Sequence, residues 1–191
     1  MILVNKIIDE VRHLIPCDIL KLYVKSFAVQ ETDNESTYKV LPDTSLIMGF
    51  QFKGKLSLLE NQKEVRLASA GVSGIADRYR TFKNSAGIGT VLVFFKEAGA
   101  ARFFKHPVHE LFRERLSLEN FMQRSKFILL EEQLCEAKTD MTRIKVIESF
   151  LISQMIMSEP DEMVFAALEL IHKSKGIING AENSPVLFYY T

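Results

Sequence analysis

The sequence predicts an α+β protein in which a β-barrel or sandwich-like N-terminal half packs with a C-terminal helical subdomain. Large apolar residues recur with period two before about residue 100, which is typical of strands. After that point they recur with helical spacing. The chain of 191 residues is 47% hydrophobic and 25% charged, a globular composition that can bury a core without disulfides or metal.

The strand patterns of the N-terminal half are short, and turn-rich segments such as "KNSAGIG" (83–89) separate them. The clearest pattern is "SLIMGFQF", which would place four large side chains on one face of a strand: Leu46, Met48, Phe50 and Phe52. Further strands are predicted at three places: 64–72, 78–82 and 89–95. Residues 1–14 fit a helix that Pro16 would stop, and 19–31 fit a helical turn or strand that continues as a strand. Short strands at this spacing favour an antiparallel sheet that closes into a barrel or sandwich.

Three helices are predicted in the C-terminal half. Ser117 is a candidate N-cap for a helix that runs to about Ala137. Thr139 or Asp140 would cap a second helix, over 141–157. Ser158 and Pro160 would open a third, and four residues would form its apolar stripe: Val164, Ala167, Leu168 and Ile171.

Charge and cysteine content narrow the classes of function. Lysine plus arginine and aspartate plus glutamate both number 24, so the formal net charge is zero. A nucleic-acid binder usually carries a basic excess, so this chain is not expected to be a complete DNA-binding protein by itself. Cys17 and Cys135 are far apart and are expected to be reduced thiols. With neither a signal peptide nor a membrane-spanning segment in the pattern, we expect a cytoplasmic protein without a membrane partner.

No group of residues predicts catalysis, metal binding or a cofactor. His106 and His109 are separated by Pro107 and have no third ligand nearby, whereas a zinc site needs three or four. The glycines at 71–74 and 87–89 lack the Gly-Lys-Ser/Thr ending of a phosphate-binding loop, and neither cysteine has an adjacent base. We therefore expect no enzyme, no catalytic residue, no metal site and no cofactor.

Two clusters on the strands have more than one interpretation. The first is a large apolar face, which we predict as the candidate ligand pocket: Met48, Phe50, Phe52, Leu92 and Phe94. A filled barrel core is the favoured explanation for it, and a cavity for an apolar or aromatic small molecule is the alternative. The second is a basic strand face of Arg78, Arg80 and Lys83, which would meet solvent or an anion.

The order of several segments resembles one known family. The segments are "IPCDILKLYVKSF" (15–27), "YKVLPDTSLIMGFQFKG" (38–54), "ASAGVSG" (68–74) and "VLVFFKEAGAARFFKHPVHELFRERLSLEN" (91–120). Together they resemble the N-terminal regulatory domain of AraC/XylS-type transcriptional regulators, although Lys96 and Glu97 replace the proline or glycine usual there. The resemblance implies a domain that senses a small-molecule effector and self-associates, as a homodimer, through its helices.

The end of the chain resembles only the beginning of the next domain in that family. The segment "MVFAALELIHKSKGII" (163–178) is similar to the first helix of the family's DNA-binding domain, and the similarity ends after Ile178. The resemblance therefore implies a truncated helix-turn-helix domain, no DNA contacts in this chain, and DNA as a partner only through a domain largely absent here. The alternative is a stand-alone small-molecule-binding domain without DNA binding.

The pattern and the resemblance together predict three segments. The first is a β-rich sensory domain over 1–100, and the second is a helical linker and dimerisation subdomain over 101–158. The third, over 159–191, is the remnant of the first DNA-binding helix followed by a tail.

Overall fold

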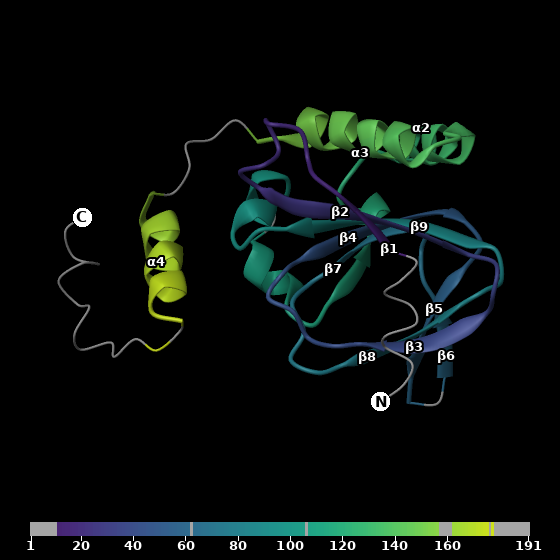
Figure 1. The fold of residues 1–191 in the computed structure, drawn as a ribbon, viewed down its shortest axis with the longest axis horizontal. Helices are drawn as coiled ribbons and strands as arrows, with labels where there is room; N and C mark the ends of the chain where they lie inside the picture. The colour runs from purple at the N-terminus through teal and green to yellow at the C-terminus, as the bar shows by residue number, and fades with distance from the viewer. Residues whose placement is uncertain (1–10, 62, 106, 157–161, 176, 178–191) are drawn as a thin grey trace. The chain divides into compact units, whose positions relative to one another are not determined.

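The computed structural model describes residues 11–61, 63–105, 107–156, 162–175 and 177. The chain forms two compact units, Met1–Ile156 and Met157–Thr191. The first unit holds every strand of the described residues, and Figure 1 shows these strands as two sheets with two long helices along one of them.

The first unit is a sandwich of two antiparallel sheets. The larger sheet has six strands in the order β1 (Val11–Leu14), β2 (Val24–Thr32), β9 (Ile88–Phe95), β4 (Ile47–Lys53), β7 (Ala70–Ser73) and β10 (Arg115–Ser117). The smaller sheet has four strands in the order β3 (Ser36–Val40), β8 (Arg80–Asn84), β5 (Leu56–Glu60) and β6 (Lys63–Arg66). Because the chain passes repeatedly from one sheet to the other, the arrangement is jelly-roll-like.

Helices cover one face of the larger sheet (Figure 1). Three short 3-10 helices follow β9: η1 (Gly99–Arg102), η2 (Val108–Leu111) and η3 (Leu118–Asn120). They lead into α2 (Arg124–Glu136) and α3 (Asp140–Gln154). The hydroxyl of Thr139 caps α3 by accepting a hydrogen bond from the Thr142 backbone N–H at 3.2 Å.

A single core joins the sheet and the helices. Its helical members are Phe127, Leu130, Leu134, Ile144, Ile147 and Leu151, all of them buried. They recur every three or four residues because this spacing returns to the same side of a helix. The predicted α+β class, with a sandwich-like half packed against helices, is therefore confirmed, and the two sheets stay separate rather than forming one closed barrel in the described residues.

Several predicted elements differ from those observed. Residues 11–14 form strand β1, paired with β2, and not the end of a helix; the rest of that predicted helix lies outside the described residues. The single strand predicted at 64–72 is two strands, because β6 and β7 belong to different sheets. Strands β3, β5 and β10 were not predicted, since they are short and their alternation of polar and apolar residues is weak.

The second unit is represented by α4 (Glu162–Lys173), which confirms a third helix; Ser158 and Pro160, which were predicted to open it, lie outside the described residues. Val164 and Ile171 of its predicted stripe are exposed, whereas Ala167 and Leu168 are half-buried. The tail at 179–191, expected to replace the rest of a DNA-binding domain, lies outside the described residues. The predicted division into segments 1–100, 101–158 and 159–191 stays a prediction about roles. Among the described helices, none has the length and apolar character needed to cross a membrane.

Candidate functional site

The two faces of the larger sheet have different surroundings. Side chains alternate along β4, so Met48, Phe50 and Phe52 share one face, and each is at most 6% exposed. This face packs against the helices: the rings of Phe50 and Phe150 meet edge-to-face, with their centroids 6.2 Å apart. We call it the helix face.

The helix face is filled. The cavity between Met48 and the surrounding helical residues, such as Leu151, has a volume of about 20 Å³. A volume of this size holds about one water molecule and no metabolite. Three of the five predicted pocket residues therefore lie in a close-packed core, but this core lies between the sheet and the helices, whereas the sequence favoured a filled barrel core.

The other two predicted pocket residues lie on the opposite face of the same sheet. The register pairs Leu92 with Gly49 and Phe94 with Ile47, whereas Val91 and Val93 pair with the residues of the helix face. Leu92 and Phe94 are only half-buried. They face the smaller sheet, on a side that we call the inner face. The sheet thus separates the predicted pocket residues into two groups that do not line one cavity.

The smaller sheet contributes an apolar row to the same interior. Tyr38, Phe82 and Leu58 are neighbours in register across β3, β8 and β5. The rings of Tyr38 and Phe82 stack with their centroids 6.0 Å apart, and Leu58 is fully buried. Burial raises the pKa of Tyr38 to about 12, because an apolar environment disfavours the charged phenolate. This row indicates an apolar interior between the sheets.

Polar side chains fasten the two sheets together at the ends of β4. Arg80 of β8 donates to the Ser73 hydroxyl of β7 at 2.8 Å and to the Arg113 carbonyl at 3.2 Å. Gln51 donates to the Ala68 carbonyl at 2.5 Å and accepts from the Leu56 N–H at 2.8 Å. These bonds hold the sheets at a fixed separation on either side of the apolar residues.

The prediction that Arg78, Arg80 and Lys83 share one strand face was wrong. Arg80 points into the sandwich with Phe82, whereas Lys83, an odd number of residues from Arg80, points outward. Arg78 precedes β8 and is exposed.

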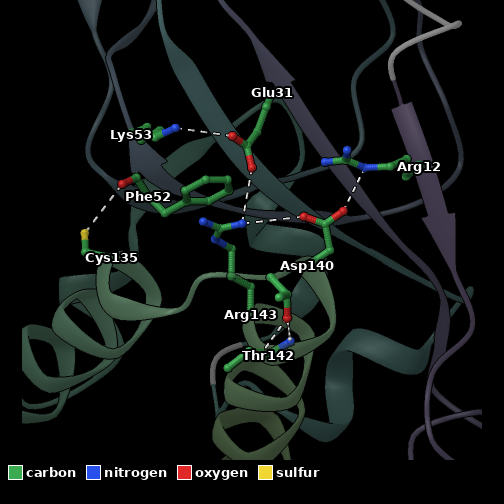
Figure 2. A network of polar contacts seen from close by, with 9 residues as sticks. Arg12, Glu31, Phe52, Lys53, Cys135, Asp140, Thr142 and Arg143 are labelled. Carbon is green, nitrogen blue, oxygen red and sulfur yellow. Dashed lines mark hydrogen bonds and ion pairs between the residues drawn. The ribbon is translucent and has the colours of Figure 1, made fainter.

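A chain of alternating charges joins the larger sheet to α3 (Figure 2). Arg12 of β1 pairs with Asp140 of α3 at 2.7 Å, and Asp140 lies 3.5 Å from Arg143 one turn later. Arg143 also pairs with Glu31 of β2 at 3.2 Å, and Glu31 lies 3.4 Å from Lys53 of β4. The network therefore ties the start of α3 to three strands.

Arg143 is the central residue of this network. Its guanidinium lies next to the Phe52 ring (Figure 2), at 3.8 Å from the ring centre, and its side chain is only 8% exposed. Its Nε atom is buried and has no hydrogen-bond partner among the described residues. A buried guanidinium needs its carboxylate partners, so α3 is held in one position on the sheet.

Two further kinds of site, a metal site and a disulfide, have little support in the described residues. No group of three or more histidine, cysteine, aspartate or glutamate side chains there is arranged to hold a metal ion. Cys17 is half-buried and Cys135 is exposed, and both are free thiols.

The fold defines a jelly-roll-like α+β domain with an apolar interior between two sheets. The chain belongs to the DUF6597 family, described as a domain of unknown function, whose model matches residues 12–117. That range is more than half of the chain and runs from β1 to the end of β10, so it contains both sheets. No curated protein matches the chain.

Several solved structures show a loose likeness of fold. ToxT from Vibrio cholerae is 10% identical with a TM-score of 0.43, over 84% of this chain and 70% of that chain. The AraC-like transcriptional activator CuxR is 11% identical with a TM-score of 0.40, over 96% of this chain and 78% of that chain. A protein described as a predicted oxalate decarboxylase from Thermotoga maritima is 13% identical with a TM-score of 0.34, over 44% of this chain and 77% of that chain. At these scores no function is transferred from them.

Proposed function

We propose that this chain is the effector-sensing and self-associating regulatory part of an AraC-type transcriptional regulator, and that it is not an enzyme. The sequence resemblance described above supports the family assignment. The observation that carries the sensing role is the difference between the two faces of the larger sheet. One face is filled, and the other presents half-buried apolar side chains to the interior of the sandwich.

The inner face favours an apolar or aromatic small molecule as effector. Leu92, Phe94 and Phe82 are large apolar side chains that keep partial exposure there. Covering apolar surface stabilises a complex by about 25 cal/mol for each Å² removed from water. A ligand that covers these three side chains would therefore bind mainly through the hydrophobic effect.

Strand β1 links the inner face to the helices. The ring of His13 lies with its centroid 6.4 Å from that of Phe94, on the inner face. The next residue back, Arg12, points to the helix face and pairs with Asp140 of α3. A ligand that displaces His13 would consequently act on Arg12 as well, and through Asp140 on the start of α3. We propose this route as the relay from effector to helices.

Self-association is the second part of the proposal. The outward sides of α2 and α3 expose large apolar side chains: Ile128 at 43%, Leu129 at 54% and Ile152 at 39%. Exposed apolar groups on adjacent helices suit a homodimer in which they pack against a second copy. Light scattering of the wild type should give a dimer mass, and Leu129→Glu should give a monomer. A monomeric wild type at high concentration would remove this part of the proposal.

The sensing role is tested by a thermal-shift screen with aromatic and aliphatic small molecules. A compound that binds the native inner face must raise the unfolding midpoint of the wild type. Phe94→Ser should abolish that shift, and Phe112→Ser should keep it, because Phe112 is an exposed phenylalanine outside the sandwich interior. If no compound raises the midpoint, or if Phe94→Ser responds like the wild type, the sensing role is wrong.

The alternative is a stand-alone small-molecule-binding domain, which the same inner face supports. The two functions differ in whether the chain pairs with an AraC-type relative, and not in their contact with DNA. Selection from a random duplex library should recover no specific sequence with this chain under either proposal, since DNA is expected as a partner only through a further domain. Co-expression with a full-length AraC-type relative should give mixed dimers if the chain is regulatory, and none if it acts alone.

A further inference from the structure

A groove of about 310 Å³ lies on the outward face of the smaller sheet. Its lining combines cations, carboxylates and two serine hydroxyls, in contrast to the apolar interior on the other side of the same sheet. The volume is near the lower end of the range found for small-molecule sites, which is about 300–1,000 Å³. The groove is separate from the inner face, so its function does not depend on the sensing role.

The strand register brings the cations of the groove together. Ser57 of β5 is paired with Lys83 of β8 on one side and with Arg66 of β6 on the other. Since adjacent strands lie about 4.8 Å apart, these three residues form one row across the sheet. Lys55 precedes Ser57 by two residues and lines the same groove.

Lys83 is already neutralised by the protein. Its ammonium lies 3.3 Å from a carboxylate oxygen of Glu35 and 3.4 Å from one of Glu64. A hydrogen bond from Ser57, reinforced by Lys83, lowers the pKa of Glu64, and the contacts with Glu35 and Glu64 raise the pKa of Lys83. The cluster of Glu35, Lys83 and Glu64 thus has more negative than positive charge.

Lys55 and Arg66, in contrast to Lys83, are not neutralised by neighbouring carboxylates among the described residues. Both line the groove and both are exposed, yet neither has an ion-pair partner within the described part of the chain. The groove therefore combines two cations that have no described carboxylate partner there, Lys55 and Arg66, with two carboxylates, Glu35 and Glu64, on either side of Lys83. A ligand that matches both kinds of group must carry an anion for the cations and hydrogen-bond donors for the carboxylates.

We propose that this groove binds a small phosphate monoester whose other end carries an ammonium or hydroxyl group. The guanidinium of Arg66 can bond two phosphate oxygens at once, and Lys55 adds a second positive charge. The donor end of the ligand would meet the carboxylates of Glu35 and Glu64. An acidic groove without free cations would repel phosphate, and a basic groove without carboxylates would not select the donor end.

The test uses two probes, phosphoethanolamine and inorganic phosphate, in titrations of the whole chain followed by amide NMR at low ionic strength. Phosphoethanolamine should give saturable shifts at residues 55–57, 64–66 and 83–85, and it should bind more tightly than phosphate. Arg66→Gln and Lys55→Gln should each weaken binding about tenfold, which is the effect of losing one charge-assisted contact. Lys138→Gln, an exposed lysine in the turn between α2 and α3, should leave binding unchanged.

Glu64→Gln distinguishes recognition of the ligand by this carboxylate from a role of Glu64 in the fold alone. Removing this carboxylate should strengthen binding of inorganic phosphate and weaken binding of phosphoethanolamine, because only the second probe carries an ammonium group. Thermal melts of every variant verify that the fold is intact. No saturable shift with either probe, or equal binding by wild type and Arg66→Gln, would overturn the proposal while leaving the sensing role untouched.

Discussion

The two faces of the larger sheet are built from alternating residues of the same strands, yet they have opposite properties. On the helix face, Met48 and Phe50 are almost fully buried against α2 and α3. On the inner face, Leu92 and Phe94 are equally large but only half-buried. The helix face therefore supplies stability, whereas the inner face keeps apolar surface available. Because consecutive side chains of a strand point to opposite faces, neighbouring residues have these two different roles.

Two glycines of the sheet, Gly89 and Gly49, show the same contrast. A Cβ added at Gly89 would point to the helix face and lie 2.3 Å from the Phe52 ring, which is too close for any real contact. A Cβ added at Gly49 would point to the inner face, and its nearest neighbour would be a Leu92 methyl at 3.3 Å. At Gly89 the helix face has no space for one methyl group, whereas at Gly49 the inner face needs only a small movement of the Leu92 side chain.

The largest effect is expected from truncating one phenylalanine on each face. Phe50→Ala should lower the free energy of unfolding by about 3–5 kcal/mol, because it opens a cavity in a closed core. Phe94→Ala should cost less, about 1–2 kcal/mol, since its side chain is only partly buried in the fold. Urea denaturation of both variants measures the difference. Equal losses would mean that the inner face is as filled as the helix face.

The second-largest loss of stability is expected from the network of charged residues that joins the larger sheet to α3. Arg143→Met should destabilise the chain by about 2–4 kcal/mol, because Glu31 and Asp140 would lose their buried partner. Arg12→Gln removes an arginine that is 57% exposed and should cost less than about 1 kcal/mol. The same urea experiment compares them. An Arg143 variant as stable as the Arg12 variant would show that the network does not fix α3.

The glycine pair gives a smaller and purely steric comparison. Gly89→Ala should cost about 1–3 kcal/mol through overpacking against Phe52. Gly49→Ala should change the free energy of unfolding by no more than about 0.5 kcal/mol, because Leu92 can move into the interior. Thermal melts are sufficient for this pair. A larger loss for Gly49→Ala would contradict the assignment of space to the inner face.

The smallest effect is expected at Tyr38, because its ionisation changes the free energy of unfolding only at alkaline pH. Its folded-state pKa is raised to about 12, above the value of about 10 for an unfolded tyrosine. The neutral phenol is favoured in the fold, so its stability contribution is complete below pH 10 and is lost as the pH rises from 10 to 12. Tyr38→Phe should reduce the fall in the urea midpoint over that range. A variant with the same alkaline loss as the wild type would show that Tyr38 is not the group responsible.

Much of this contrast could be predicted from the sequence, and one decisive part could not. The alternation in β4 correctly grouped Met48, Phe50 and Phe52, because polar or small residues separate them. In β9 the run "VLVFF" is apolar at every position, so the pattern does not say which residues face the helices. Leu92 and Phe94 were therefore joined to the wrong face, and only the pairing with β4 separates them.

The charged groove and the network around Arg143 could not be predicted from the sequence either, for a different reason. Arg143 and Glu31 are 112 residues apart, and Lys55, Arg66 and Lys83 come from different strands. Isolated charges of this kind usually mark a solvated surface. Their partners follow from strand order and register, which local periodicity does not determine.

The most direct test of the sensing role is methyl NMR of the chain bound to the most stabilising compound from the thermal screen. With leucine and methionine methyl groups labelled, the compound should show nuclear Overhauser effects to the Leu92 methyls and none to Met48. Contacts with Met48 or Leu151 instead would place the ligand in the helix-covered core, and would contradict the proposal that the inner face is the binding surface.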